Sequence, residues 1–128
     1  MNRGYERYPM GHEGVSMEVS ARIEEQMQVV SVQENRIDAA VALAFKDAMR
    51  NATADGPDTI VLDLGKVDFI DSSGLGAIVA TMKHLAPSRK LVLAGLTPAV
   101  DKVFRLTRMD TVFSLFPSMD DALAQMQS

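Results

Sequence analysis

The sequence predicts an α/β fold in which a mixed sheet of about four to five strands carries about four helices packed on it. Short apolar runs that are long enough for strands and too short for helices recur through the chain. Segments with apolar residues at helical spacing lie between these runs. From Asp38 onward the two kinds of segment alternate, and such alternation requires parallel strands joined by right-handed crossovers.

The first residues differ in composition from the rest of the chain. Residues 1–16 are rich in Gly, Arg, Glu and Tyr and contain few aliphatic side chains, so we expect a flexible N-terminal tail. Residues 17–128 have the length and apolar content of one packed unit. The predicted organisation is therefore a tail, 1–16, followed by a single domain, 17–128.

The first half of the domain contains two predicted strands and one helix. Residues 17–23 alternate loosely between apolar and polar side chains, and residues 28–32 carry β-branched side chains, so both segments are expected to form strands joined by a turn at 24–26. Residues 39–51 have apolar side chains at helical spacing, and Asp38 is the expected N-cap of this helix.

The middle of the domain contains a buried strand followed by a helix. The run 59–64 is mainly apolar, which is typical of a strand buried on both faces. Residues 69–70 return to the core, and a helix then runs from Ser72 to the turn at Pro87. Its expected apolar stripe consists of Leu75, Ile78, Val79, Met82 and Leu85.

The last third repeats the alternation. Residues 91–94 and 111–116 are predicted strands, and 97–109 and 119–127 are predicted helices. Thr97 followed by Pro98 is a typical helix start, because Thr caps the first turn and Pro suits its first position. The buried face of this third helix is expected to contain Val100, Val103, Phe104 and Leu106.

The stretch Asp71-Ser72-Ser73-Gly74-Leu75-Gly76 joins the middle strand to its helix. Two hydroxyls and an acid lie where the helix begins, and helix N-termini carry free N–H groups that favour anions. Local chemistry leaves two interpretations open. Asp71 and Ser72 could simply cap the helix, or a hydroxyl could accept a phosphate beside ready donors.

Composition excludes several function classes. The net charge is −4 and no cluster of Lys and Arg is present, which argues against nucleic-acid binding. The chain has no Cys, so disulfides and Cys-ligated metals are excluded. No apolar run approaches the roughly 20 residues that span a bilayer. We expect a cytoplasmic protein without direct membrane contact.

Enzyme motifs are missing around the serines. A dinucleotide fingerprint would need a third Gly where Val79 stands, and a nucleophile elbow would need Gly where Ile70 stands. His84 lies about three helical turns beyond Ser72, too far to activate it. We therefore predict no catalytic residues and no cofactor. Three acids, Asp63, Asp68 and Asp71, could form a hard-metal site, but capping and turn roles are expected instead, and no metal is predicted.

The motif also resembles that of a known family. Asp71 to Gly76, preceded by the apolar strand 60–64, resembles the hallmark of STAS domains, and most of all the stand-alone anti-sigma factor antagonists of bacteria. The resemblance extends over about residues 17–125. It includes the segments Arg36-Ile37-Asp38-Ala39, Leu91-Val92-Leu93-Ala94-Gly95, Thr97-Pro98-Ala99-Val100 and Phe113 to Phe116.

The resemblance implies a phosphorylation switch in a protein that is not an enzyme. Ser72 matches the serine that the family phosphorylates, and Asp71 matches the adjacent acid. The unphosphorylated antagonist is expected to sequester an anti-sigma factor that is a serine kinase of the GHKL ATPase type. The same kinase then phosphorylates Ser72, and a PP2C-type phosphatase resets it. Ser73 is expected to be mainly structural.

The expected partner surface is the motif with the exposed face of its helix. It consists of Asp71, Ser72, Ser73, Leu75, Gly76, Val79, Met82 and Lys83. Two alternatives remain: a STAS subunit of an ABC-type lipid transporter, or a constitutive adaptor. The intact pair Ser72 and Ser73 favours the phosphorylation switch. An enzyme or nucleotide-binding protein is disfavoured because the chain lacks a usable base, a cysteine and a phosphate loop.

Overall fold

The computed structural model describes residues 6–7, 10–12 and 15–127. Its main sheet has six strands in the order β1-β4-β5-β7-β9-β10. These are β1 (Glu6–Arg7), β4 (Val19–Glu24), β5 (Met27–Val32), β7 (Thr59–Asp63), β9 (Lys90–Ala94) and β10 (Leu115–Phe116). The pairs β1–β4 and β4–β5 are antiparallel, and the other three pairs are parallel. The sheet is therefore mixed, as predicted.

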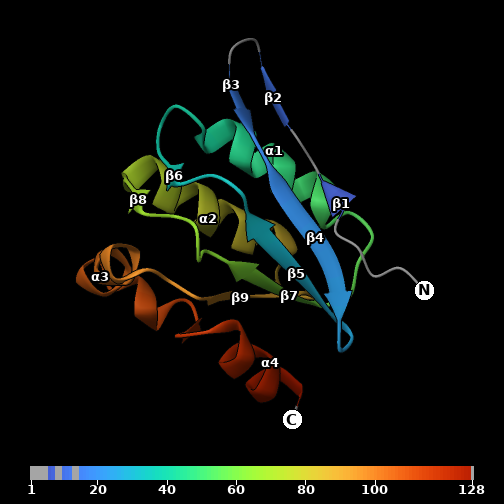
Figure 1. Ribbon diagram of the computed structural model, residues 1–128. Coiled ribbons are helices and arrows are strands. Elements are labelled where there is room, and N and C mark those ends of the chain that lie inside the picture. Colours follow the sequence, from blue (N-terminus) through green and yellow to red (C-terminus); the bar gives the residue numbers. More distant parts are fainter. Residues whose placement is uncertain (1–5, 8–9, 13–14, 128) are drawn as a thin grey trace.

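Two small strand pairs flank this sheet. The pair β2 (Met10–His12) and β3 (Val15–Met17) is antiparallel, whereas β6 (Arg36–Ile37) and β8 (Phe69–Ile70) are parallel. The second pair matters for function, because it holds the chain that leads into the serine motif beside the chain that leads into the first helix (Figure 1).

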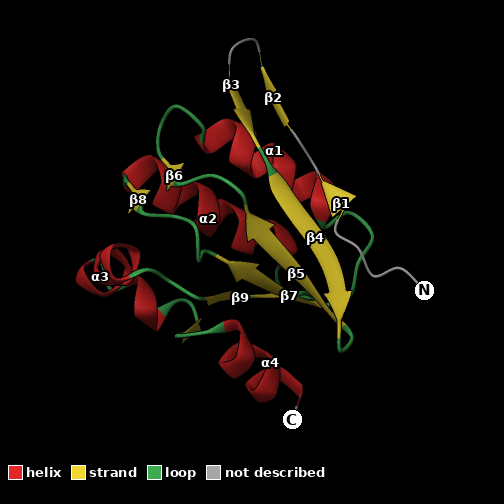
Figure 2. Ribbon diagram, in the orientation of Figure 1, coloured by secondary structure: helices red, strands yellow, loops and turns green. Residues whose placement is uncertain are grey.

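Four α-helices pack on the sheet (Figure 2). They are α1 (Ala42–Ala52), α2 (Ser72–Leu85), α3 (Pro98–Leu106) and α4 (Met119–Gln127), with a 3-10 turn, η1 (Met109–Thr111), after α3. Phe45 of α1, Ile78 of α2 and Phe104 of α3 belong to one core cluster, and Ala122 of α4 to a second. The first three helices thus cover one face of the sheet and α4 covers the other. None of the helices in the described ranges is long and apolar enough to cross a membrane.

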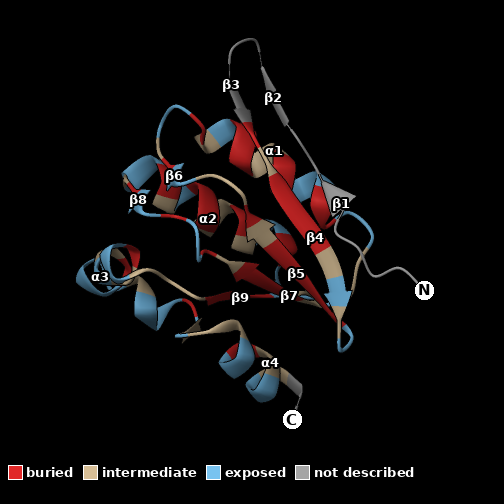
Figure 3. Cartoon of the chain, in the orientation of Figure 1, coloured by how far each residue is buried: buried red, intermediate tan, exposed pale blue. Residues whose placement is uncertain are grey.

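Strand residues alternate between these two cores. On β7, Ile60 and Leu62 belong to the cluster under α1 to α3, and Val61 between them belongs to the cluster under α4. All three are fully buried, and Figure 3 shows that much of the central sheet is buried. Adjacent side chains on a strand point to opposite faces, so a strand covered on both sides has to be apolar throughout. This explains why residues 60–62 form an unbroken apolar run in the sequence.

The predicted α/β class, the mixed sheet and the four helices are confirmed. The sheet has six strands instead of four to five, because β1 adds to its edge from within the segment 1–16. The short strands β1 and β2 and the start of β3 fall in that segment, and its remaining residues lie outside the described ranges. The flexibility of residues 1–16 stays a prediction.

The prediction that Asp38 caps the first helix is wrong. Helix α1 begins at Ala42, and its N-cap residue, Val41, makes no side-chain cap. The Asp38 carboxylate instead accepts a hydrogen bond from the Ala40 N–H at 3.1 Å and pairs with Arg36 at 2.9 Å. An Asp that bonds a backbone N–H two residues on stabilises a turn rather than a helix start. The turn delays α1 by three residues relative to the expected start at Ala39.

The predicted strand 111–116 is also wrong in extent. Residues 109–111 form η1, and only 115–116 pair with β9. Arg108 has a positive φ of 64°, which ends the helical segment before η1. Phe113 packs edge-on against Phe104, with ring centroids 6.0 Å apart, so it enters the core from a turn. Leu106, expected on the buried face, is 73% exposed because α3 ends there.

Candidate functional site

The serine motif lies at the start of α2, directly after β8. Asp71 is the N-cap residue, and its Oδ1 accepts a hydrogen bond from the Gly74 N–H at 2.9 Å. Ser72 and Ser73 are the first two residues of the helix, and both are exposed. Their backbone N–H groups belong to the helix start, where intrahelical carbonyls are lacking. The cap is made by Asp71, which leaves the Ser72 hydroxyl on the surface.

Asp71 also connects the motif to the loop before α1. Its Oδ2 accepts a hydrogen bond from the Ala39 N–H at 3.1 Å, and its own N–H donates to the Ile37 carbonyl at 3.4 Å. The bond from the Gly74 N–H is the main cause that lowers the pKa of Asp71; partial desolvation opposes it, and the Ala39 N–H adds to the lowering. The residue beside Ser72 therefore stays a carboxylate at neutral pH.

The substitution Asp71→Asn tests how much the charge of Asp71 contributes to stability. Asn caps helices as well as Asp does, so the substitution removes the charge and keeps the cap. A carboxylate with a lowered pKa stabilises the fold above its unfolded pKa of about 3.9 and loses this effect as the pH falls through the lower folded value. The difference in Tm between the natural chain and Asp71→Asn should therefore be largest near neutral pH and shrink below about pH 4. A difference that stays constant from neutral to acid pH would contradict the role given to the charge.

Gly74 allows the start of α2 to approach the neighbouring chain. A Cβ at this position would lie 1.9 Å from the Ile37 carbonyl oxygen and 2.7 Å from its carbon. Both are backbone atoms of β6, which is held by its pairing with β8. Gly76 differs, because a Cβ there would meet nothing within 4 Å. The two glycines of the motif therefore have different roles: one permits packing, and the other leaves the helix surface open.

The structure distributes the predicted partner surface along one side of α2. Ser72, Ser73, Gly76 and Lys83 are exposed, whereas Asp71, Leu75, Val79 and Met82 are half-buried. Ser72, Gly76, Val79 and Lys83 follow the three- and four-residue spacing of a single helix face. The structure thus places exposed residues of the predicted set along this face, next to the Ser72 hydroxyl.

The predicted buried stripe of α2 is rotated in the structure. Its buried residues are Gly74, Ala77, Ile78, Thr81 and Leu85. Ile78 and Leu85 were expected there, but Leu75, Val79 and Met82 are only partly buried against the same core. Small residues, including Gly74 and Ala77, take the buried side of the helix instead, and at Gly74 the helix lies directly against the Ile37 carbonyl of β6. Three apolar side chains are thereby left at the border of the exposed face.

Sequence reasoning missed two exposed apolar residues near the motif. Phe69, expected to return to the core, is 53% exposed, because its neighbour Ile70 takes the inward position of the two-residue strand β8. Leu43, in the first turn of α1, is 54% exposed. Alternation within β8 could have indicated Phe69, but the exposure of Leu43 depends on the packing of α1 against its neighbours.

The structure does not bring the three acids Asp63, Asp68 and Asp71 together in one cluster. Asp71 is engaged as described, and the Asp63 carboxylate accepts from the Gly65 N–H at 2.9 Å and the Ser31 hydroxyl at 3.2 Å. Among the residues that the structure describes, no group of three His, Asp or Glu side chains lies close enough to hold a metal ion. Asp71 therefore caps a helix, and Asp63 stabilises a turn.

Comparisons with known proteins agree with this geometry. The chain is 32% identical over 87 residues to the anti-sigma-F factor antagonist RsfB of Mycobacterium tuberculosis, covering 68% of this chain and 71% of that protein. The crystal structure of an anti-sigma factor antagonist from Mycobacterium paratuberculosis superimposes with a TM-score of 0.78 at 31% identity, covering 88% and 95% of the two chains.

A more distant relative shares the fold. The Bacillus cell fate determinant SpoIIAA in its phosphorylated form superimposes with a TM-score of 0.60 at 18% identity, covering 84% of this chain and 98% of that one. The family model for the STAS domain matches residues 18–122, which include the strands β4, β5, β7, β9 and β10 of the main sheet, the serine motif and all of α2. The predicted resemblance is therefore confirmed, and the chain belongs to the STAS domain family.

Proposed function

We propose that this protein is an anti-sigma factor antagonist whose binding is controlled by phosphorylation of Ser72. The observation that carries the proposal is the exposed Ser72 hydroxyl at the first position of α2, beside a carboxylate held in place by two backbone N–H groups. The names of the relatives support the antagonist role, since RsfB is called an anti-sigma-F factor antagonist.

The unphosphorylated surface suits a protein partner. The exposed face of α2 has few charged side chains near Ser72. Half-buried Leu75 and Val79 border this face, and Phe69 on the preceding strand is exposed. Apolar area of this kind stabilises a complex when it is covered. We infer that a kinase-type anti-sigma factor covers this face while Ser72 carries no phosphate, and that the chain acts by binding and not by catalysis.

Phosphorylation would reverse this preference. A phosphoryl group brings roughly −1.5 to −2 charges next to the Asp71 carboxylate. Arg36, on the strand paired with β8, pairs with the Asp38 carboxylate. Covering two adjacent anions costs several kcal/mol if they lack a counter-charge. The same partner, a GHKL-type serine kinase, would be released, and a PP2C-type phosphatase would restore binding in the cytoplasm.

The test is intact mass and peptide mapping of the protein isolated from its native host under phosphatase inhibition. We expect a fraction of the chain to carry one phosphate, mapped to Ser72. A phosphate mapped to Ser73 would contradict the residue assignment. Absence of phosphate under all growth conditions would contradict the switch and favour the transporter-subunit or constitutive-adaptor alternative.

A further inference from the structure

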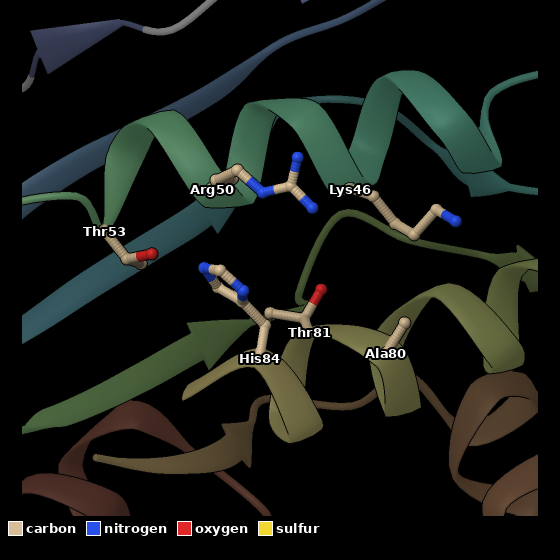
Figure 4. A pocket seen from close by; sticks show the side chains of 6 residues that line it. All are labelled: Lys46, Arg50, Thr53, Ala80, Thr81 and His84. Atoms are coloured by element: carbon tan, nitrogen blue, oxygen red, sulfur yellow. The ribbon is translucent and has the colours of Figure 1, made fainter. Parts of the chain in front are cut away.

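A small pocket lies between α1 and α2, away from the serine motif (Figure 4). It is lined by Lys46, Arg50, Thr53, Ala80, Thr81 and His84. Its volume is about 40 Å³. Since one water needs roughly 10–15 Å³, the pocket has room for a group of a few heavy atoms. His84 is twelve residues beyond Ser72 on α2, or about 18 Å along the helix, so the pocket is separate from the serine motif.

Basic side chains line both walls. Figure 4 shows Lys46 and Arg50 on the α1 side of the gap and the His84 imidazole on the α2 side. No carboxylate is among the described residues that line it. The ion pairs found in the described ranges involve other cations, namely Arg22, Arg36 and Arg105. In a chain of net charge −4, two helices thus bring three basic side chains to one pocket.

The two threonine hydroxyls that line the pocket cannot donate to a ligand. Thr53 Oγ1 donates to the Met49 carbonyl at 2.8 Å, and Thr81 Oγ1 donates to the Ala77 carbonyl at 2.9 Å. A hydroxyl has one proton, so both are used within their helices. A ligand would therefore be held by the guanidinium, the ammonium and the imidazole N–H. Ala80 has a short side chain and leaves access between the helices.

We propose that this pocket binds a small phosphate-bearing anion. Arg and Lys donors match phosphate oxygens, and Arg can do so with two parallel hydrogen bonds. A tetrahedral dianion can accept from donors on both walls at once, whereas a single carboxylate offers fewer oxygens and one charge. The pocket volume fits the phosphate group itself and leaves the rest of a larger molecule outside. The site is independent of the phosphorylation proposed at Ser72.

A purely structural role for these basic side chains makes a different prediction. Arg50 lies in the last turn of α1 and His84 in the last turn of α2, where positive charge stabilises the carbonyl end of a helix. If that were their whole role, replacing them would lower Tm, and the natural chain would show no phosphate-specific binding.

The test is an NMR titration of the full chain with sodium phosphate, against sodium chloride at the same ionic strength. We expect saturable shifts of the Thr53, Thr81 and His84 amides with phosphate alone. A parallel titration with glycerol phosphate distinguishes free phosphate from an organic phosphate as the ligand. An equal Kd indicates that the free phosphate ion is sufficient, and a lower Kd for glycerol phosphate indicates an organic phosphate. Equal shifts with chloride, or shifts spread over the whole surface, would overturn the proposal.

Two double variants remove the same amount of charge. Lys46→Gln with Arg50→Gln should raise the Kd for phosphate at least about ten-fold, because charged donors are lost. Lys90→Gln with Lys102→Gln, on exposed positions of β9 and α3, should leave it unchanged. A similar loss in both double variants would show that phosphate responds only to net charge and would overturn the assignment.

Discussion

Ser72→Glu is expected to weaken binding of the kinase-type anti-sigma factor by about 100-fold or more, whereas Ser72→Ala should bind at least as tightly as the unphosphorylated chain. The glutamate would place a second carboxylate beside Asp71 at the centre of the proposed interface. An unpaired charge buried in a complex costs several kcal/mol, and each 1.4 kcal/mol changes Kd about ten-fold. Isothermal titration calorimetry with the purified partner measures both variants directly.

The neighbouring hydroxyl provides a matched control. Ser73 is also exposed but lies about 100° further round α2. Ser73→Glu adds the same charge and should weaken binding less than Ser72→Glu. The chain phosphorylated at Ser72 should also fail to bind. Tight binding by that phosphorylated form, or equal losses in the two glutamate variants, would contradict electrostatic exclusion centred on Ser72.

Gly74→Ala is expected to destabilise the fold by at least about 3 kcal/mol, at the high end for a single added methyl group. The new Cβ would lie 1.9 Å from the Ile37 carbonyl oxygen, far inside van der Waals contact. Relief would require α2 to move away from β6, which would also break the hydrogen bond from Ala39 to Asp71. Urea denaturation followed by circular dichroism measures the loss.

Gly76→Ala is the control for this prediction, since it makes the same chemical change two residues later. Its Cβ would meet nothing within 4 Å, and Ala within a helix is more stable than Gly by about 0.5–1 kcal/mol. We therefore expect opposite signs for the two substitutions. Two destabilised variants, or a Gly74→Ala chain as stable as the natural one, would contradict the close approach between α2 and β6.

Much of the fold could be predicted because its signals are local. The run at β7 is apolar since both faces of that strand are covered, and Thr97 with Pro98 starts α3 where expected, with the Val100 N–H donating to Thr97 Oγ1. The start of α2 was equally readable, because capping by Asp71 involves a residue only three positions away. Segments without such signals were placed less well, as the short β10 shows.

Errors arose at the ends of elements, where a competing contact or the length of the element decides the outcome. Asp38 has the residue type of an N-cap, but Arg36 and the Ala40 N–H engage its carboxylate, and α1 begins later. Leu106 has the spacing of a buried residue, yet α3 ends at its position and leaves it in solvent. Spacing reports which residues share a helix face, but it does not report how far the neighbouring element extends.

By itself, the sequence determined the α/β class, the order of helices and strands and the position of the serine motif at a helix start. Hydrophobic periodicity and capping act over a few residues, which is why a linear reading can find them. Only the tertiary structure decided that Gly74 touches Ile37, that Asp71 holds the loop at Ala39, and that α1 and α2 place Arg50 near His84. These contacts join residues more than 30 positions apart, and packing alone brings them together.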